Sequence, residues 1–114
     1  MAEISKEVAD KVYEAIEVAK ATGRIKKGSN EVTKSIEKGT AKLVAIAKNV
    51  NPPEITMHIP LLSKEKDVLC VEVPSKEELG AAAGISVGTA SIAIIEEGEA
   101  KNTVKDIIKK LKEQ

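Results

Sequence analysis

The sequence predicts an α/β fold, a three-layer α/β/α sandwich around a mixed four-stranded sheet. Two observations support this prediction. Segments with helical periodicity alternate along the chain with about four short apolar runs of strand length. The run at residues 42–47 is continuously apolar instead of alternating, which indicates a strand covered on both faces. The chain of 114 residues suits a single domain that spans residues 1–114.

The first part of the chain predicts two helices with a short strand between them. Residues 4–21 are expected to form a helix, because apolar residues recur at a four-residue spacing: Ile4, Val8, Val12 and Ile16. Gly23 would end this helix in the left-handed conformation common at helix C-termini. Residues 24–27 suit an edge strand. A second helix then starts with Ser29 as its N-cap and closes at Gly39.

The middle of the chain predicts two buried strands around a broken helix. The strand at residues 42–47 is followed by a turn with two prolines at 49–53. A third helix over residues 54–65 is expected to be interrupted at Pro60, because proline removes a backbone donor. Residues 68–73 form the next strand.

The last part of the chain predicts a helix, a loop, a strand and a final helix. Ser75 and Glu78 have the spacing of a capping box, and the short helix that they start ends at Gly84. Residues 85–89 form a loop before a strand at 90–95. The final helix carries apolar residues at i, i+3, i+4 and i+7: Val104, Ile107, Ile108 and Leu111.

The composition narrows the possible functions. The net charge of zero argues against non-specific polyanion binding as the main activity. Tyr13 is the only aromatic residue, which excludes the stacking platforms of many single-strand binders. No apolar run approaches the roughly 20 residues of a membrane span, and the N-terminus lacks the apolar core of a signal peptide. With Cys70 as the single cysteine, we expect a cytoplasmic protein without an internal disulfide.

The second predicted helix has two faces of different character. On a helical wheel with Asn30 at the origin, Lys34, Lys38 and Glu31 fall within about 100° of it. Val32 and Ile36 fall on the opposite side, where they can pack inward. The free amides of the first turn, the helix dipole and the flexible Gly28 favour an anion at the helix start. Two donors and one acceptor beside such a start can read the edge of a nucleobase.

Several stretches resemble a known family. Residues Lys27-Gly-Ser-Asn-Glu-Val-Thr-Lys34, with Gly39 after them, are similar to the signature of the kink-turn-binding ribosomal proteins, the L-seven-Ae family. The order of the predicted elements agrees with that family. Four further stretches match it: Asn-Pro-Pro-Glu-Ile at 51–55, Ile-Pro-Leu-Leu at 59–62, Pro-Ser-Lys-Glu-Glu-Leu-Gly at 74–80 and Ala-Gly-Ile-Ser-Val at 83–87. The resemblance covers nearly the whole chain.

The resemblance implies a target for the polar helix face. A kink-turn is an RNA helix bent sharply at a bulge that is flanked by tandem sheared G·A pairs, which leave the guanine Watson–Crick edge largely free. By similarity, Asn30 and Lys34 would donate to guanine O6 and N7. Glu31 would accept from a guanine imino or amino group. Lys27 and Lys38 match positions that contact backbone phosphates.

Other positions of the resemblance concern the bulged nucleotide and the choice of RNA. Ile55 and Lys76 match positions that line the pocket for the extruded nucleotide, and Asn51 stands where many relatives carry an acidic residue. Val87-Gly88 stands where the eukaryotic small RNP protein has Arg-Pro, and the apolar loop Ile85-Ser86-Val87 resembles the archaeal type. The archaeal type tolerates both kink-turns and the kink-loop variant. The resemblance favours the archaeal member, shared between the large ribosomal subunit, C/D and H/ACA guide RNPs and RNase P. Its partners would be those RNAs and the core proteins of the guide RNPs, and the free protein would be monomeric.

Other interpretations stay open on the residues alone. The polar helix face could be a solvated surface with a Glu–Lys pair. An α/β module for a small ligand or a protein partner, without RNA specificity, could use the apolar loop at residues 85–87. An enzyme is disfavoured, because the sequence has no nucleophile–base pair, metal cluster or cofactor loop. We expect no cofactor and no metal: His58 lacks partners at ligand spacing, and Cys70 suits the core.

Overall fold

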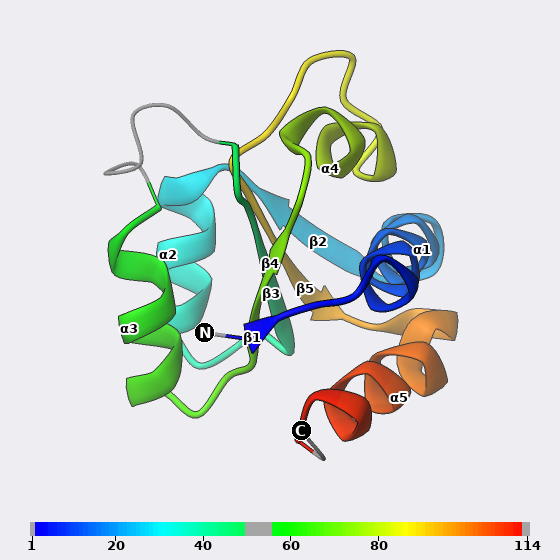
Figure 1. Ribbon diagram of the computed structural model, residues 1–114. Helices are drawn as coiled ribbons and strands as arrows, with labels where there is room; N and C mark the ends of the chain where they lie inside the picture. Colours follow the sequence, from blue (N-terminus) through cyan, green and yellow to red (C-terminus); the bar gives the residue numbers. More distant parts are fainter. Residues whose placement is uncertain (1, 50–55, 113–114) are drawn as a thin grey trace.

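The computed structural model describes residues 2–49 and 56–112, which form one mixed sheet of five strands in the order β1-β4-β3-β5-β2 (Figure 1). Strand β3 runs parallel to β4, which runs parallel to β1, whereas β5 is antiparallel to both β3 and β2. The strands are β1 (Ala2–Glu3), β2 (Arg24–Lys27), β3 (Leu43–Ala47), β4 (Cys70–Val73) and β5 (Ser91–Glu96).

The four predicted strands are confirmed as β2 to β5, but the prediction missed β1. The chain start was expected to lead directly into a helix. Instead, Ala2 and Glu3 pair with Val71 and Glu72 at the edge of the sheet. Two residues are too few to show an alternating apolar pattern, so only the partner strand defines this one.

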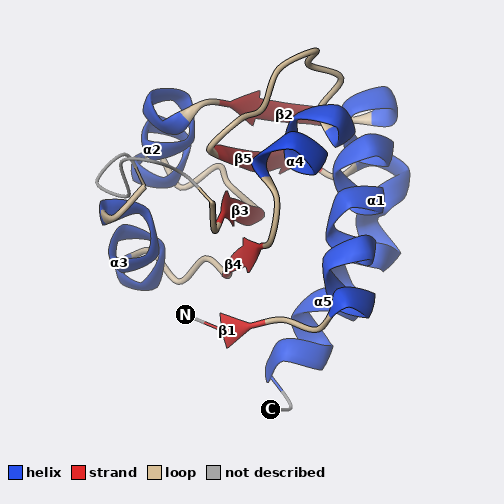
Figure 2. Cartoon of the chain, turned by 45° about the horizontal axis from the view of Figure 1, so that its top comes forward, coloured by secondary structure: helices blue, strands red, loops and turns tan. Residues whose placement is uncertain are grey.

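Helices cover both faces of the sheet, which confirms the three-layer α/β/α sandwich. In Figure 2, α2 and α3 lie on one side of the strands and α1, α4 and α5 on the other. The helices are α1 (Lys6–Thr22), α2 (Ser29–Glu37), α3 (His58–Glu65), α4 (Lys76–Ala82) and α5 (Lys101–Lys112), with a 3₁₀ turn at Gly98–Ala100 before the last.

The core consists of two apolar clusters separated by the sheet. Strand β3 is buried along its whole length, as its continuous apolarity predicted. Successive strand side chains point to opposite faces. Leu43 and Ala45 therefore join the cluster under α1, α4 and α5, whereas Val44 and Ile46 join the cluster under α2 and α3. The final helix packs Val104, Ile107 and Leu111 into the first cluster, as expected.

Two helix starts differ from the prediction. Helix α1 begins at Lys6, after Ser5, whose hydroxyl accepts a hydrogen bond from the Val8 amide at 3.3 Å. Helix α2 has Gly28 as its N-cap, so Ser29 is the first helical residue and no side chain caps this helix. The Ser29 hydroxyl instead accepts from the Ser91 hydroxyl at 3.4 Å, because β5 lies beside the helix start.

Pro60 does not interrupt α3. The helix starts at His58, and residues 56–57 form a turn before it, whereas the predicted start at 54 lies outside the described residues. Pro60 is the third residue of the helix. The first four amides of a helix have no intrahelical acceptor, so a proline there removes no hydrogen bond.

Gly23 follows the last residue of α1, as predicted, but the predicted left-handed conformation is wrong. Its φ of −136° is not left-handed. A Cβ atom at this position would collide with the backbone of Glu96 and Gly98. Glycine is therefore needed for the close approach of the α1 C-terminus to the end of β5, not for its own conformation.

Candidate nucleic-acid interface

The predicted site elements meet at one edge of the sheet, because β2, β3 and β4 all end where β5 begins. The Gly28 amide donates to the Ser91 carbonyl at 3.1 Å, which joins the start of α2 to β5. The Ala47 amide donates to the Ala90 carbonyl at 2.9 Å, which joins the end of β3 to the loop before β5. The start of α2 and the loop that leads into β5 therefore lie at the same edge of the sheet, whereas residues 51–53 lie outside the described residues.

Helix α2 presents the polar face that the helical wheel predicted. Asn30, Glu31, Lys34 and Lys38 are all exposed. Val32 and Ile36 on the opposite side are fully buried under the sheet. Among the described residues no ion pair involves Glu31 or Lys34. The Glu–Lys pair of the alternative interpretation, a solvated helix face, does not form. The Glu31 carboxylate and the Lys34 ammonium group therefore both face solvent.

Gly28 shapes the entry to α2. Its φ of 90° and ψ of 149° lie in a region that is essentially restricted to glycine. Its carbonyl accepts the Val32 amide at 2.9 Å, so the amides of residues 29–31 precede the first intrahelical hydrogen bond. These amides and the positive end of the helix dipole would favour an anion at the start of α2, and anion binding there stays a prediction.

Lys27 and Lys38 lie at the two ends of this face. Lys27 is exposed at the end of β2, immediately before the helix start. Lys38 is the C-cap of α2, roughly 15 Å further along the helix axis at 1.5 Å per residue. The two lysines can therefore contact separate points of a ligand that runs along α2.

Backbone hydrogen bonds hold Lys76 against the end of the loop at 85–89. Its amide donates to Asn49 Oδ1 at 2.8 Å, and its carbonyl accepts the Thr89 amide at 3.1 Å. Ser75 caps α4 by accepting the Glu78 amide at 3.2 Å, which confirms half of the capping box. The other half differs, because the carboxylate that contacts the cap belongs to Glu77.

Asn49 is a residue of the candidate site that the sequence interpretation missed. Besides its bond to Lys76, its side-chain amide donates to Glu77 Oε2 at 3.1 Å. This hydrogen bond is the main reason that the pKa of the Glu77 carboxyl lies below its usual value. The available signal was an asparagine two residues after the end of a buried strand, but its partners lie 27 and 28 residues further along the chain.

The loop after α4 exposes an apolar tip. Val87 is 68% exposed and Ser86 is also exposed, whereas Ile85 is half-buried against the larger core cluster. Gly80 allows the loop to pack on α4, since a Cβ atom there would collide with the Val87 carbonyl. Of the eleven predicted site residues, only Ile55 falls outside the described part of the chain.

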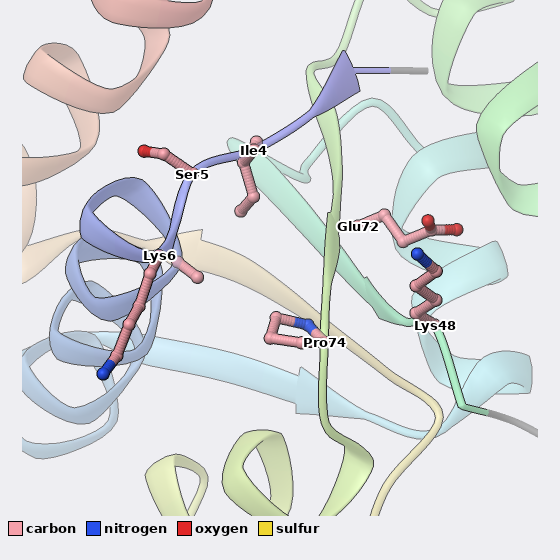
Figure 3. A pocket seen from close by; sticks show the side chains of 7 residues that line it. Ile4, Ser5, Lys6, Lys48, Glu72 and Pro74 are labelled. Atoms are coloured by element: carbon pink, nitrogen blue, oxygen red, sulfur yellow. The ribbon is translucent and has the colours of Figure 1, made fainter.

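A separate pocket of about 560 Å³ lies at the start of α1 (Figure 3). It is lined by Ile4, Ser5, Lys6, Ala9, Lys48, Glu72 and Pro74. Figure 3 shows the Lys6 side chain extending away from Glu72 and Lys48. This pocket contains none of the predicted RNA-binding residues.

The described residues offer no sign of metal or thiol chemistry. No group of three His, Cys, Asp or Glu side chains is placed to hold a metal ion within residues 2–49 and 56–112. Cys70 is buried, and its desolvation raises the pKa of the thiol to about 11, which disfavours the reactive thiolate. No helix in the same ranges is long and apolar enough to cross a membrane.

Comparison with known proteins identifies the class to which this fold and site belong. Residues 10–104 match the model of the Ribosomal protein L7Ae/L30e/S12e/Gadd45 family, and the chain belongs to this family. A solved structure, the Giardia lamblia 15.5kD RNA binding protein, is similar over 98% of this chain and 93% of its own, with 31% identity and a TM-score of 0.93. The resemblance found in the sequence is thus confirmed.

Proposed function

We propose that this protein is a non-catalytic RNA-binding protein that recognises kink-turns through the exposed face of α2. Family membership and the RNA-binding relative support RNA as the ligand class. The observation that carries the finer proposal is the exposed carboxylate of Glu31, which forms no ion pair with any described residue and stands among the donors of Asn30 and Lys34. A surface for phosphates alone needs no carboxylate, whereas a guanine edge presents both donors and acceptors.

In this proposal each part of the interface has a distinct role. Asn30 and Lys34 donate to guanine O6 and N7, and Glu31 accepts from the guanine imino or amino group. Lys27, Lys38 and the amides that follow Gly28 contact phosphates. Ile55, Lys76 and the tip of the loop at 85–87 contact the extruded nucleotide and its neighbours. Binding selects the bent RNA from a flexible population, and the mechanism is therefore a shift of that population.

The proposal extends to the particles that contain such RNA. We propose that the chain is an archaeal-type member that binds kink-turns and kink-loops in large-subunit rRNA, C/D and H/ACA guide RNAs and RNase P RNA. The bent RNA and the protein then form a platform for the core proteins of these particles. The free protein is proposed to be monomeric and cytoplasmic.

Binding to matched RNAs tests this proposal. A gel-shift titration would compare a kink-turn RNA with the same RNA in which the tandem G·A pairs are replaced by Watson–Crick pairs. Losing one well-placed guanine contact corresponds to an affinity loss of about 5- to 150-fold, so we expect at least that discrimination. Equal affinity for the two RNAs would contradict kink-turn recognition.

The exposed Val87 supports a second candidate, an α/β module that binds a protein partner through the loop at 85–87. An apolar side chain that is 68% exposed suits a protein contact as well as an unstacked base. The variant Val87→Ser distinguishes the two, because it weakens kink-turn binding only if the loop contacts RNA. Unchanged binding by Val87→Ser would assign the loop to another partner.

A further inference from the structure

One side-chain hydrogen bond joins α3 to the first turns of the candidate RNA-binding helix. His58 Nε2 lies 2.8 Å from Thr33 Oγ1, across a separation of 25 residues. The two helices lie side by side in Figure 1 and Figure 2. Thr33 lies in the same turns of α2 as Asn30, Glu31 and Lys34, so the contact fixes the helix segment that carries the proposed guanine-reading group.

The direction of this hydrogen bond follows from the other bond of Thr33. Its hydroxyl donates to the Ser29 carbonyl at 2.7 Å, and a hydroxyl has only one hydrogen. Thr33 Oγ1 must therefore accept from His58, and the Nε2 atom of the imidazole carries a hydrogen. The contact is thus a directed bond from α3 into the first turns of α2.

Helix α2 needs such support because it is short and narrowly anchored. It has nine residues, fewer than an isolated helix needs to be stable in water. Its large apolar anchors, Val32 and Ile36, lie on one stripe. A single apolar stripe fixes the distance between the helix and the sheet better than it fixes the rotation of the helix about its own axis. A rotation of about 20° moves side-chain ends by about 2 Å at a radius near 6 Å, which exceeds the tolerance of a binding constellation.

Two contacts oppose this rotation from different sides. On the sheet side, Ser91 accepts the Gly28 amide at 3.1 Å through its carbonyl and contacts the Ser29 hydroxyl through its own hydroxyl. On the α3 side, His58 binds Thr33. The backbone at His58 is held in place by its neighbour Ile59. The Ile59 side chain is fully buried, and the Ile59 amide donates to the Thr56 carbonyl at 3.1 Å.

We propose that His58 and Thr33 are positioning residues for RNA recognition, which hold α2 in the rotation that aims Asn30, Glu31 and Lys34 at the RNA. This inference rests on the function proposed above. If the bond is lost, only part of the folded population keeps the competent rotation, and the apparent affinity falls by that fraction. The net value of one hydrogen bond sets this effect at about 3- to 10-fold.

The test uses variants that remove or retain the bond. We expect Thr33→Val and His58→Ala each to weaken kink-turn binding by about 3- to 10-fold. The double variant should be no weaker than either single variant, because both remove the same contact. Thr33→Ser keeps the hydroxyl and His58→Gln places an amide donor near the Nε2 position, so both should bind within about twofold of wild type.

A matched control separates positioning from stability. Thr40 also donates its hydroxyl to a carbonyl of α2, that of Ser35 at 3.2 Å, but it follows the C-terminal end of the helix. Thr40→Val should therefore bind within about twofold of wild type. Urea unfolding of each variant checks that the protein is folded under the conditions of the binding assay. If the bond contributed only to stability, the affinity of the folded variants for RNA would be unchanged.

The possible results keep this inference apart from the proposed function. Wild-type protein that discriminates the G·A pairs, together with weak Thr33→Val and His58→Ala variants, supports the inference. The same discrimination with unaffected variants, or with additive effects in the double variant, overturns the inference and leaves the function in place. Failure of wild-type protein to discriminate refutes the function itself.

Discussion

Replacing Glu31 by glutamine tests the proposed recognition by the sign of the effect. Glu31 is exposed at the third position of α2, and no ion pair holds it among the described residues. Glutamine keeps the size of the side chain but removes the charge and adds two N–H donors. If α2 attracts RNA only by charge, Glu31→Gln should bind more tightly. If Glu31 accepts from guanine, the variant should bind more weakly.

The magnitudes separate binding from stability. Loss of a good base contact costs about 1–3 kcal/mol, which is an affinity loss of about 5- to 150-fold. The cost in stability is smaller. Glu31 lies near the positive end of the α2 dipole, and removing its charge costs about 0.3–1 kcal/mol of unfolding free energy. Most of the effect should therefore appear in RNA affinity.

Glu37→Gln is the matched control for this measurement. Glu37 is exposed in the same helix, but it is the last residue of α2 and lies at the negative end of the dipole. A gel-shift titration at fixed salt should show Glu37→Gln at wild-type affinity or slightly tighter, because a negative charge has been removed. Glu31→Gln that matches Glu37→Gln in affinity would refute guanine recognition by this carboxylate.

Three further predictions concern the scaffold. Gly28→Ala should lower the unfolding free energy in urea by about 1–3 kcal/mol, because φ 90° and ψ 149° strain any residue with a Cβ atom although the space around it is open; unchanged stability would contradict this reason. Gly80→Ala should cost about 1–3 kcal/mol in the same assay by pushing the Val87 carbonyl away from α4, and stability equal to wild type would show that the loop yields freely. Lys11 Nζ lies 2.6 Å from Asp106 Oδ2, and this hydrogen bond lowers the pKa of the Asp106 carboxyl and raises that of the Lys11 ammonium group. The bond therefore stabilises the fold fully between the ordinary values of 3.8 and 10.5, and the stability gap between wild type and Lys11→Met should shrink as the pH falls below or rises above this window; a gap independent of pH would argue against the pair.

Elements with a strong internal pattern were predictable from the sequence. The continuous apolar run at 42–47 gave a strand buried on both faces, and the stripe of Val104, Ile107 and Leu111 gave a packed final helix. The elements that were missed or misplaced lack such a pattern. Strand β1 has two residues and exists only through its pairing with β4. The expected break at Pro60 is absent, because the effect of a proline depends on where the helix begins, and α3 begins only at His58.

The candidate site divides in the same way. The exposed face of α2 was predictable, because the angular spacing of residues along one helix is fixed by local geometry. The contacts that hold this face were not predictable. Asn49 reaches α4 across 27 residues, Ser91 reaches the start of α2 across 62, and His58 reaches Thr33 across 25. No periodic pattern in the sequence connects the two residues of any of these pairs.

The sequence by itself determined which side chains the second helix presents together, with the carboxylate of Glu31 among the donors of Asn30 and Lys34. It determined this because a helix repeats about every 3.6 residues, whatever surrounds it. Only the tertiary structure decided how that helix is aimed. Its orientation depends on the strand ends, the backbone of Gly28 and the contact with His58, whereas Lys76 is placed by its bond to Asn49. These contacts join residues that are distant along the chain, and only the folded sheet brings them to one edge.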